Sequence, residues 1–178
     1  SKTPMTKENI RLLAVARMAV RPDSVVWDVG AGTGSVSAAC AMAAWQGQVW
    51  AVEKEPEALD LIRQNRKALG LWNLRVVEGE APAALADLPK PDCVFIGGSS
   101  GSMADIFQTV LEKNPAARIC LTAVSLESLT DGLDCMKRFG LADVDVTQIS
   151  AAQARNLGRY RMMMGQNPVW ILSGEGRP

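Results

Sequence analysis

The stretch Val25-Val26-Trp27-Asp28-Val29-Gly30-Ala31-Gly32-Thr33-Gly34 decides the fold of this chain. A short apolar run with one acidic residue leads into three glycines at alternate positions. An apolar run of this length that enters a glycine turn predicts a buried parallel strand. Glycines let the backbone turn tightly and let a ligand approach without Cβ atoms in the way. We expect a helix to follow directly, over residues 35–46, with its N-terminal amides facing that ligand.

The spacing of the glycines indicates the kind of ligand. Dinucleotide-binding turns follow the pattern G-x-G-x-x-G, whereas this turn has G-x-G-x-G with Asp28 two residues ahead. The difference favours a nucleoside without a pyrophosphate, such as S-adenosylmethionine. The alternative is a glycine-rich strand-to-helix turn that binds nothing.

A second apolar run, Val49-Trp50-Ala51-Val52-Glu53, ends in a carboxylate. In a doubly wound sheet, the acidic residue that ends the second strand lies beside the first glycine turn, where it can accept hydrogen bonds from ribose hydroxyls. Glu53 lies about 20 residues beyond the glycines, the separation expected of a ribose-binding acid. The alternative is a surface glutamate that opens a loop.

The composition indicates one compact domain. The chain has 178 residues, of which 48% are hydrophobic and 21% are charged, which suits a single domain with a substantial core. Within a single domain over residues 1–178, we expect an N-terminal helical cover at 1–20, a ligand-binding α/β core at 21–140 and a C-terminal hairpin at 141–178.

Charge and residue usage exclude several classes of function. Lys+Arg and Asp+Glu are equal at 19 each, so no net field attracts nucleic acid. The absence of histidine excludes imidazole catalysis and His-ligated metal sites, and no metal site is predicted. No stretch reaches the length of a membrane span, and no signal peptide is visible. The cysteines lie singly in apolar segments, which favours buried free thiols in the cytoplasm; they are Cys40, Cys93, Cys120 and Cys135.

The alternation of strand and helix patterns predicts an α/β sandwich. Seven strands are expected, over residues 25–29, 49–53, 74–77, 93–96, 118–124, 144–149 and 169–172. The last two have no helix between them and should pair antiparallel, so the sheet is mostly parallel with a C-terminal antiparallel hairpin. Ligands should bind at the carboxyl ends of the parallel strands.

The expected helices cover residues 6–18, capped by Thr6, then 35–46, a segment from Pro56 to Gly70, 103–113, and a segment that Ser125 caps and Gly140 ends. The first precedes the glycine strand and could cover the pocket. The last should present a core stripe made of Leu126, Leu129, Leu133, Met136 and Phe139.

Three further loops lie at the ligand-binding edge of this predicted sheet. Residues 78–82 hold Glu80 and Ala81, and could contact an adenine or simply form a helix-capping loop. Gly97, Gly98 and Ser99 follow the fourth strand, where a methyl donor and acceptor would meet, or else form an ordinary flexible turn. Thr122 ends the fifth strand and lines the same cavity or has only a structural role.

The connection over residues 153–166 is long for a hairpin, and long loops in compact domains are often functional. Its arginines, Arg155, Arg159 and Arg161, could bind carboxylates bidentately, stay solvated or pair across a subunit interface. The run Met162-Met163-Met164 could be edge-strand core or an interface patch.

Five pieces of the chain together resemble one family. They are Pro4-Met5-Thr6-Lys7, the glycine turn from Asp28 to Gly34, Gly79-Glu80-Ala81-Pro82-Ala83-Ala84-Leu85, Phe95-Ile96-Gly97-Gly98-Ser99, and Asn167-Pro168-Val169-Trp170-Ile171-Leu172. In this order they are similar to the decarboxylating precorrin methyltransferases of cobalamin biosynthesis, which belong to the class I S-adenosylmethionine-dependent methyltransferases. In that family the domain occurs alone or fused behind a C5-methyltransferase.

The resemblance implies a Rossmann-like sandwich that methylates C15 of precorrin-6B or cobalt-precorrin-6B, an anionic tetrapyrrole, and removes CO2 from its C12 acetate. It also implies a homo-oligomer, a tetramer in similar proteins. The glycines would hold the methionine part of the cofactor, Glu53 the ribose and Glu80-Ala81 the adenine, although Glu80 stands where the family often has Asp.

The implied site is a set of residues from both ends of the chain. The cofactor-binding candidates are Thr6, Asp28, Gly30, Ala31, Gly32, Thr33, Gly34, Glu53, Lys54, Glu80, Ala81 and Gly97. The acceptor-site candidates are Gly98, Ser99, Thr122 and Arg155, and Pro4 and Thr6 would help to close the pocket.

Three other interpretations compete with this one. The first is a class I methyltransferase that acts on RNA, protein or a small metabolite; balanced charge disfavours RNA, and Gly97-Gly98-Ser99 stands where N6-amine enzymes have Asn-Pro-Pro-Tyr. The second is a non-catalytic module that binds S-adenosylmethionine, which the intact glycines disfavour. The third is an NAD-dependent oxidoreductase, which the glycine spacing disfavours.

Overall fold

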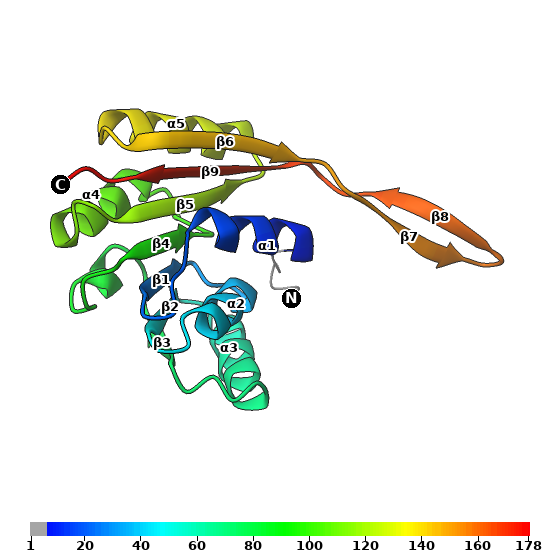
Figure 1. The fold of residues 1–178 in the computed structure, drawn as a ribbon. Coiled ribbons are helices and arrows are strands. Elements are labelled where there is room, and N and C mark those ends of the chain that lie inside the picture. Colours follow the sequence, from blue (N-terminus) through cyan, green and yellow to red (C-terminus); the bar gives the residue numbers. More distant parts are fainter. Residues whose placement is uncertain (1–6) are drawn as a thin grey trace.

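A computed structural model describes residues 7–178, built around one large sheet (Figure 1). The sheet has seven strands in the order β3-β2-β1-β4-β5-β9-β6. β9 runs antiparallel to both of its neighbours, and the other adjacent strands are parallel. The predicted α/β sandwich with an antiparallel C-terminal pair is therefore confirmed. The strands are β1 (Val25–Val29), β2 (Gln48–Glu53), β3 (Leu74–Glu78), β4 (Cys93–Ile96), β5 (Arg118–Ala123), β6 (Ala142–Ile149) and β9 (Val169–Glu175).

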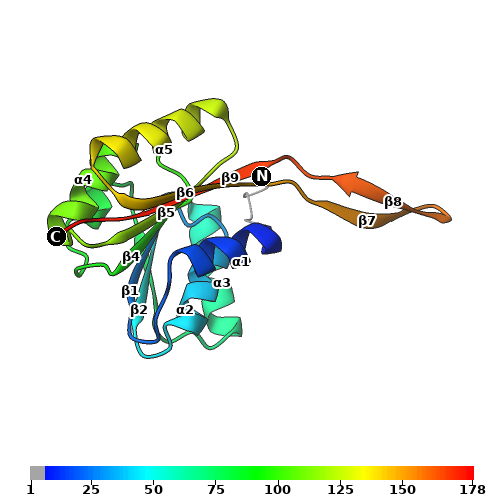
Figure 2. The ribbon, with the colours of Figure 1, turned by 45° about the horizontal axis from the view of Figure 1, so that its top comes forward.

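Helices cover both faces of the sheet (Figure 2). One face carries α1 (Glu8–Arg17), α2 (Ser35–Ala43) and α3 (Pro56–Ala68), and the other carries α4 (Met103–Lys113), α5 (Leu126–Arg138) and the short helix η1 (Ala83–Leu85). Successive residues of β1 point to opposite faces, so Val26 lies in the first hydrophobic core and Trp27 in the second. None of the helices within residues 7–178 is long and apolar enough to cross a membrane.

Several helix ends follow the predicted signals. Pro56 stands in the first turn of α3, and Gly70 follows its end with a φ of 63°. The Ser125 hydroxyl accepts a hydrogen bond of 3.1 Å from the Ser128 N–H at the start of α5, and Gly140 lies just past its end with a φ of 63°. α1 begins at Glu8 with Lys7 at its N-cap, and Thr6 lies outside the described residues.

The predicted end of the helix after the glycine turn is wrong. α2 ends at Ala43, three residues before the expected end, because Ala44 leaves the helical conformation with φ −93° and ψ 51°. The Asn73 amide donates hydrogen bonds to the carbonyls of Ala41 (2.9 Å) and Ala44 (2.7 Å). A residue remote in sequence thus satisfies the end of this helix.

The predicted core stripe of α5 is also wrong in part. Leu126 is 67% exposed and Leu133 is 40% exposed, whereas Gly132, Cys135 and Met136 are buried. A Cβ at Gly132 would lie 3.0 Å from Leu121 and 3.1 Å from Leu172. The helix therefore approaches the sheet most closely along its glycine, which leaves these two leucines outside the contact.

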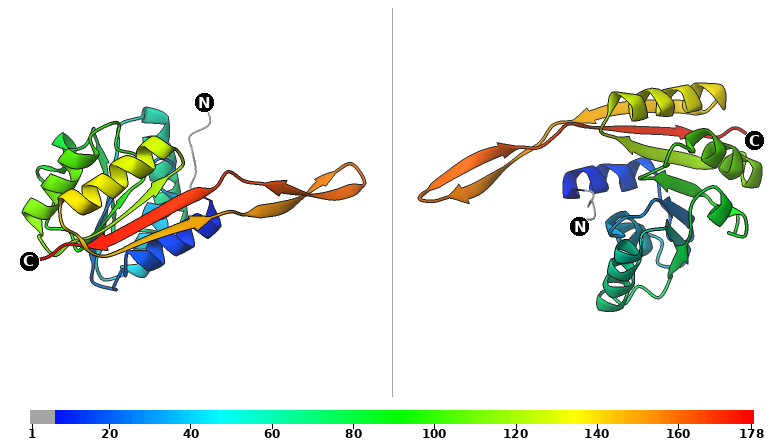
Figure 3. Two further views of the ribbon diagram at one scale, coloured as in Figure 1. Left: turned by 90° about the horizontal axis from the view of Figure 1, so that it is seen from above. Right: turned by 180° about the vertical axis from the view of Figure 1, so that it is seen from behind.

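The segment expected to be a long connection forms a second, two-stranded sheet. β7 (Ala152–Leu157) and β8 (Tyr160–Gly165) pair antiparallel, with Arg155 opposite Met162. This β7–β8 hairpin projects away from the body of the molecule (Figure 3), and both of its strands are exposed along their whole length. The methionine run is therefore not edge-strand core.

The four cysteines are free and buried, as predicted. Burial raises the pKa of Cys93 and of Cys120 to about 12. These thiols are therefore protonated and unreactive in the folded protein.

Candidate active site

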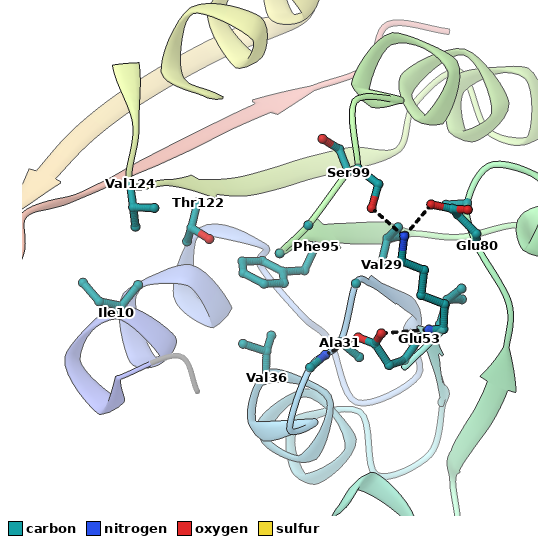
Figure 4. Close-up of a pocket in the computed structure, with 18 of the residues that line it drawn as sticks. Ile10, Val29, Ala31, Val36, Glu53, Glu80, Phe95, Ser99, Thr122 and Val124 are labelled. Carbon is teal, nitrogen blue, oxygen red and sulfur yellow. Dashed lines mark hydrogen bonds and ion pairs between the residues drawn. The ribbon is translucent and has the colours of Figure 1, made fainter. Parts of the chain in front are cut away.

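A pocket of about 590 Å³ lies at the carboxyl ends of the parallel strands (Figure 4). This size is in the range of small-molecule sites. Ile10 of α1 and Lys7 at its N-cap contribute to the wall, so the start of this helix borders the pocket. The lining residues are Lys7, Ile10, Val29, Gly30, Ala31, Gly32, Val36, Val52, Glu53, Lys54, Gly79, Glu80, Ala81, Phe95, Gly97, Gly98, Ser99, Ser100, Thr122, Val124, Asn167 and Val169.

Glu53 ends β2 beside the glycine turn, where the sequence predicts it. Its Oε2 accepts a hydrogen bond of 2.8 Å from the Gly32 N–H, and its Oε1 accepts bonds of 2.8 Å from Lys54 N–H and 3.0 Å from Glu55 N–H. These three bonds compensate the burial of a carboxylate that is only 8% exposed. Oε1 uses both of its lone pairs in these bonds, but Oε2 retains one, so the fixed carboxylate can still accept a hydrogen bond from a ligand in the pocket.

The glycine turn has left-handed backbone at all three glycines, with φ of 69° at Gly30, 55° at Gly32 and 74° at Gly34. A Cβ at Gly30 would lie 2.6 Å from the carbonyl oxygen of Gly98, and one at Gly34 would lie 2.8 Å from Ile62. At these two positions the packing of the protein itself also requires glycine. Gly30 is required by the close approach of the loop after β4, and Gly34 by α3.

A lysine joins three loops at the edge of the pocket. Lys54 Nζ donates hydrogen bonds to Glu80 Oε1 at 2.7 Å and to Ser100 Oγ at 3.3 Å, which links the ends of β2, β3 and β4 (Figure 4). The hydrogen bond and the attraction of opposite charges lower the pKa of Glu80 and raise the pKa of Lys54. Both groups are therefore charged near neutral pH.

The other end of the pocket is apolar. In Figure 4, Ile10 and Val124 lie on one side of the Phe95 ring, and the two carboxylates Glu53 and Glu80 lie on the other side. Thr122 is half-buried and supplies a hydroxyl on the same side. The pocket thus has an acidic end and an apolar end.

The structure brings most of the predicted site residues together in the lining. Of the cofactor candidates, Gly30, Ala31, Gly32, Glu53, Lys54, Glu80, Ala81 and Gly97 line the pocket, as do the acceptor candidates Gly98, Ser99 and Thr122. Asp28, Thr33, Gly34 and Arg155 are outside the lining formed by the described residues, and Thr6 is not among those residues.

Two of the residues outside the lining have clear surroundings. Asp28 is fully buried and accepts a hydrogen bond from the Ser37 hydroxyl, and burial raises its pKa to about 6. Arg155 lies on the exposed β7–β8 hairpin. Neither side chain contributes to the pocket wall of its own chain.

Sequence reasoning assigned no role to several lining residues, namely Lys7, Ile10, Val36, Phe95, Val124, Asn167 and Val169. They come from different elements that only the folded structure brings together. One signal could have found Val169: it starts a strand predicted to be antiparallel, so it had to lie at the carboxyl edge of the parallel strands.

The chain has clear relatives. Residues 1–174 match the precorrin methyltransferase domain family. A probable cobalt-precorrin-6B C(15)-methyltransferase (decarboxylating) of Saccharolobus solfataricus is 35% identical over 176 residues, which cover 97% of this chain and 88% of the relative. The cobalt-precorrin-6B C(15)-methyltransferase (decarboxylating) of Salmonella typhimurium is 33% identical over 171 residues, which cover 96% and 88%.

The fold agrees with the sequence relationship. The crystal structure of a precorrin-6y C5,15-methyltransferase from Geobacter metallireducens superposes with a TM-score of 0.92 at 34% identity and covers 98% of this chain and 92% of the other. The fold, a mostly parallel seven-stranded sheet with one antiparallel strand, is that of the class I methyltransferases among its solved neighbours. On this evidence, the chain belongs to the precorrin methyltransferase domain family.

Proposed function

We propose that this protein transfers a methyl group from S-adenosylmethionine to C15 of precorrin-6B or cobalt-precorrin-6B and removes the C12 acetate as CO2, a reaction of cobalamin biosynthesis. The names of its relatives over almost the whole chain support this assignment. The observation that carries it is the Glu53 carboxylate, fixed on the glycine turn in the wall of a pocket of suitable size.

The residues present fit the cofactor. In this proposal Glu53 accepts a hydrogen bond from a ribose hydroxyl, because its Oε2 keeps a free lone pair beside the pocket. The loop with Glu80 and Ala81 receives the adenine, and the turn over residues 30–34 holds the methionine part. Asp28, Thr33 and Gly34 then act by shaping this turn, since they lie outside the lining.

Bound S-adenosylmethionine supplies an electrophilic methyl group on a sulfonium. The chain has no histidine, and the proposed chemistry does not require one, because reduced tetrapyrroles carry enamine-like carbons that are already nucleophilic. The task of the protein is to hold donor and acceptor in line, and positioning alone can supply a large part of the rate enhancement. Gly97, Gly98 and Ser99 border the acceptor, and their small side chains let a bulky macrocycle approach.

We also propose that the protein is a homo-oligomer, a tetramer, in which the β7–β8 hairpin is covered. A two-stranded hairpin by itself is at best marginally stable in water. This one exposes five large apolar side chains, Leu157, Tyr160, Met162, Met163 and Met164. It also carries three arginines and no acidic residue, so the rest of a chain of zero net charge is negative. Charge and apolar area thus both favour a second copy as the partner.

The arginines of the hairpin keep two possible partners in this proposal. They meet either acidic side chains of the neighbouring copy or peripheral carboxylates of the tetrapyrrole, and Arg155 is the acceptor-site candidate among them.

We further propose that the protein acts in the cytoplasm as a single methyltransferase domain, alone or with a C5-methyltransferase. Its four free cysteines suit a reducing compartment.

The test is a turnover assay of the purified chain with S-adenosylmethionine and cobalt-precorrin-6B. S-adenosylhomocysteine should form only when the macrocycle is present, and a catechol or a transfer RNA in its place should give none. Turnover with either of those acceptors and none with the macrocycle would assign the chain to a different methyltransferase reaction.

A further inference from the structure

The pocket separates charge from apolar surface. Glu53 and Glu80 lie at one end, and Ile10 and Val124 lie at the other (Figure 4). The Phe95 ring lies between these two groups. Val169 also belongs to the lining and is 8% exposed, Ile10 is 5% exposed and Phe95 is 2% exposed. We call the group Ile10, Phe95, Val124 and Val169 the apolar wall.

Cations are scarce in this pocket. Among the described residues of the lining, the only cations are Lys7 and Lys54. Lys54 is at the acidic end, bound to Glu80 at 2.7 Å. Lys7 is exposed, one residue before the start of α1, so its ammonium is hydrated. A carboxylate placed against the apolar wall would therefore find no buried cation in this part of the chain.

An apolar surface without a cation destabilises a bound carboxylate and therefore favours its loss as CO2. A carboxylate moved from water into an apolar site without a charged partner loses hydration worth several kcal/mol. Loss of CO2 moves the negative charge from the desolvated carboxylate to the macrocycle, over which the remaining electron pair is spread. Contacts of the protein with the remainder of a large acceptor can supply the binding energy that holds the group there.

We propose that the apolar wall binds the acetate arm that is lost as CO2, and that the lack of a buried cation among the described residues there promotes its decarboxylation. This inference rests on the proposed function and adds the location of its second half-reaction. The bond between the acetate CH2 and its carboxylate carbon breaks, and its electron pair passes into the conjugated macrocycle. CO2 leaves, and the CH2 carbon takes up one proton from water and becomes a methyl group.

The same separation explains how one carboxylate is chosen from several. The other carboxylates of the macrocycle remain hydrated outside the apolar wall. Only the arm directed at the apolar wall loses its water. The pocket thus selects the leaving carboxylate by desolvation rather than by a specific hydrogen bond.

The test places a cation at the apolar wall. Val124 is 70% exposed, so V124R should fold, and titration with S-adenosylhomocysteine verifies that the cofactor site is intact. V124M is the matched control, with a long side chain but no charge. Both are assayed with cobalt-precorrin-6B labelled with 13C in the acetate carboxyl, and released CO2 and S-adenosylhomocysteine are measured in the same reaction.

In V124M, the two products should form in equal amounts whatever the rate. In V124R, the guanidinium should hold the acetate as an ion pair, so that the ratio of CO2 to S-adenosylhomocysteine falls at least tenfold and a methylated product that keeps its acetate accumulates. A V124R variant that releases both products equally, or that forms neither while V124M forms both, would overturn the inference. Failure of the proposed function would look different, because the wild-type protein would then form no S-adenosylhomocysteine with this acceptor.

Discussion

The Glu53 carboxylate and the Gly32 backbone N–H are joined by a hydrogen bond of 2.8 Å, which ties the end of β2 to the glycine turn of β1. The acid proposed to bind the ribose is therefore also part of the structure that shapes the turn. Cofactor affinity and the conformation of the turn should depend on the same side chain.

Replacement of Glu53 by Ala should remove this link together with the ribose contact. A hydrogen bond to a charged group contributes about 1.5–3 kcal/mol, so the dissociation constant of S-adenosylhomocysteine should rise by a factor of about 10 to 150. Isothermal titration calorimetry measures this, with E57A as the control because Glu57 is an exposed acid in the first turn of α3. Equal affinities of E53A and E57A would contradict the assigned role.

The contact between Lys54 and Glu80 should affect binding more than stability. Both side chains are exposed, and exposed ion pairs contribute little to folding, so K54M should keep the thermal midpoint of the wild type. It should weaken the binding of S-adenosylhomocysteine several-fold, because the loop that receives the adenine loses its link to β2 and to Ser100. In a double-mutant cycle with E80Q, the two effects should not add; full additivity would show that the pair does not act as a unit.

Asp28 should give the protein a distinct pH dependence of stability. Burial raises its pKa to about 6 from an ordinary 3.8, so between these values the folded state binds more protons than the unfolded chain. The free energy of unfolding therefore falls as pH rises through this window, by about 3 kcal/mol from this group. D28N should lack that decline, so its stability relative to the wild type should rise by about this amount between pH 4 and pH 7.

Urea unfolding at the two pH values measures the effect. The asparagine carbonyl can still accept the hydrogen bond from Ser37, so the comparison isolates the charge. Parallel stability profiles of wild type and D28N would mean that the carboxylate is not desolvated in the folded state.

A methyl group at Gly30 should disturb the turn and the loop after β4 together. Gly30 has a φ of 69°, and a Cβ there would lie 2.6–2.9 Å from backbone atoms of Gly98. Overpacking against backbone and a left-handed alanine together should cost about 2–4 kcal/mol. G98A is the comparison, since a Cβ at Gly98 meets nothing within 4 Å, and it should cost less than about 1 kcal/mol in the same denaturation experiment. Similar losses in both variants would speak against this packing.

A negative charge introduced on the β7–β8 hairpin should disrupt the proposed tetramer. Met163 is 65% exposed in the single chain, so M163E should leave the fold intact but place a carboxylate in the covered surface. Light scattering coupled to gel filtration should find a tetramer for the wild type and for K90E, a charge change at an exposed residue elsewhere, and smaller species for M163E. A monomeric wild type would exclude the assembly, and a tetrameric M163E would move the interface away from this strand.

The sequence predicts those parts of the fold in which local pattern and burial agree. β1, β4 and α4 have the expected bounds because an apolar run or a single amphipathic stripe coincides with one buried surface. The end of α2 could not be predicted, since Asn73, remote in sequence, satisfies its last carbonyls. The β7–β8 hairpin was missed as strands because both of its faces are exposed and its residues show no alternation.

The residues of the candidate site likewise fall into those that the sequence predicts and those that it does not. Glu53, Glu80 and the loop over residues 97–99 follow from the rule that ligands bind at the carboxyl ends of parallel strands. The apolar wall does not, because Ile10, Val124 and Val169 look like ordinary core residues until α1, β5 and β9 are placed around one pocket. The close approach of Gly30 to Gly98 likewise cannot be predicted from the local sequence, because it depends on how the two loops pack in the folded protein.

The position of the transferred methyl group tests most directly whether the protein methylates C15 and removes the C12 acetate. The purified chain is incubated with cobalt-precorrin-6B and S-adenosylmethionine that carries a 13C-labelled methyl group, and the product is analysed by NMR together with the CO2 released. We expect label at C15, an unlabelled methyl group at C12 and one CO2 for each S-adenosylhomocysteine. Label at any other carbon, or methylation with the C12 acetate retained by the wild-type protein, would contradict it.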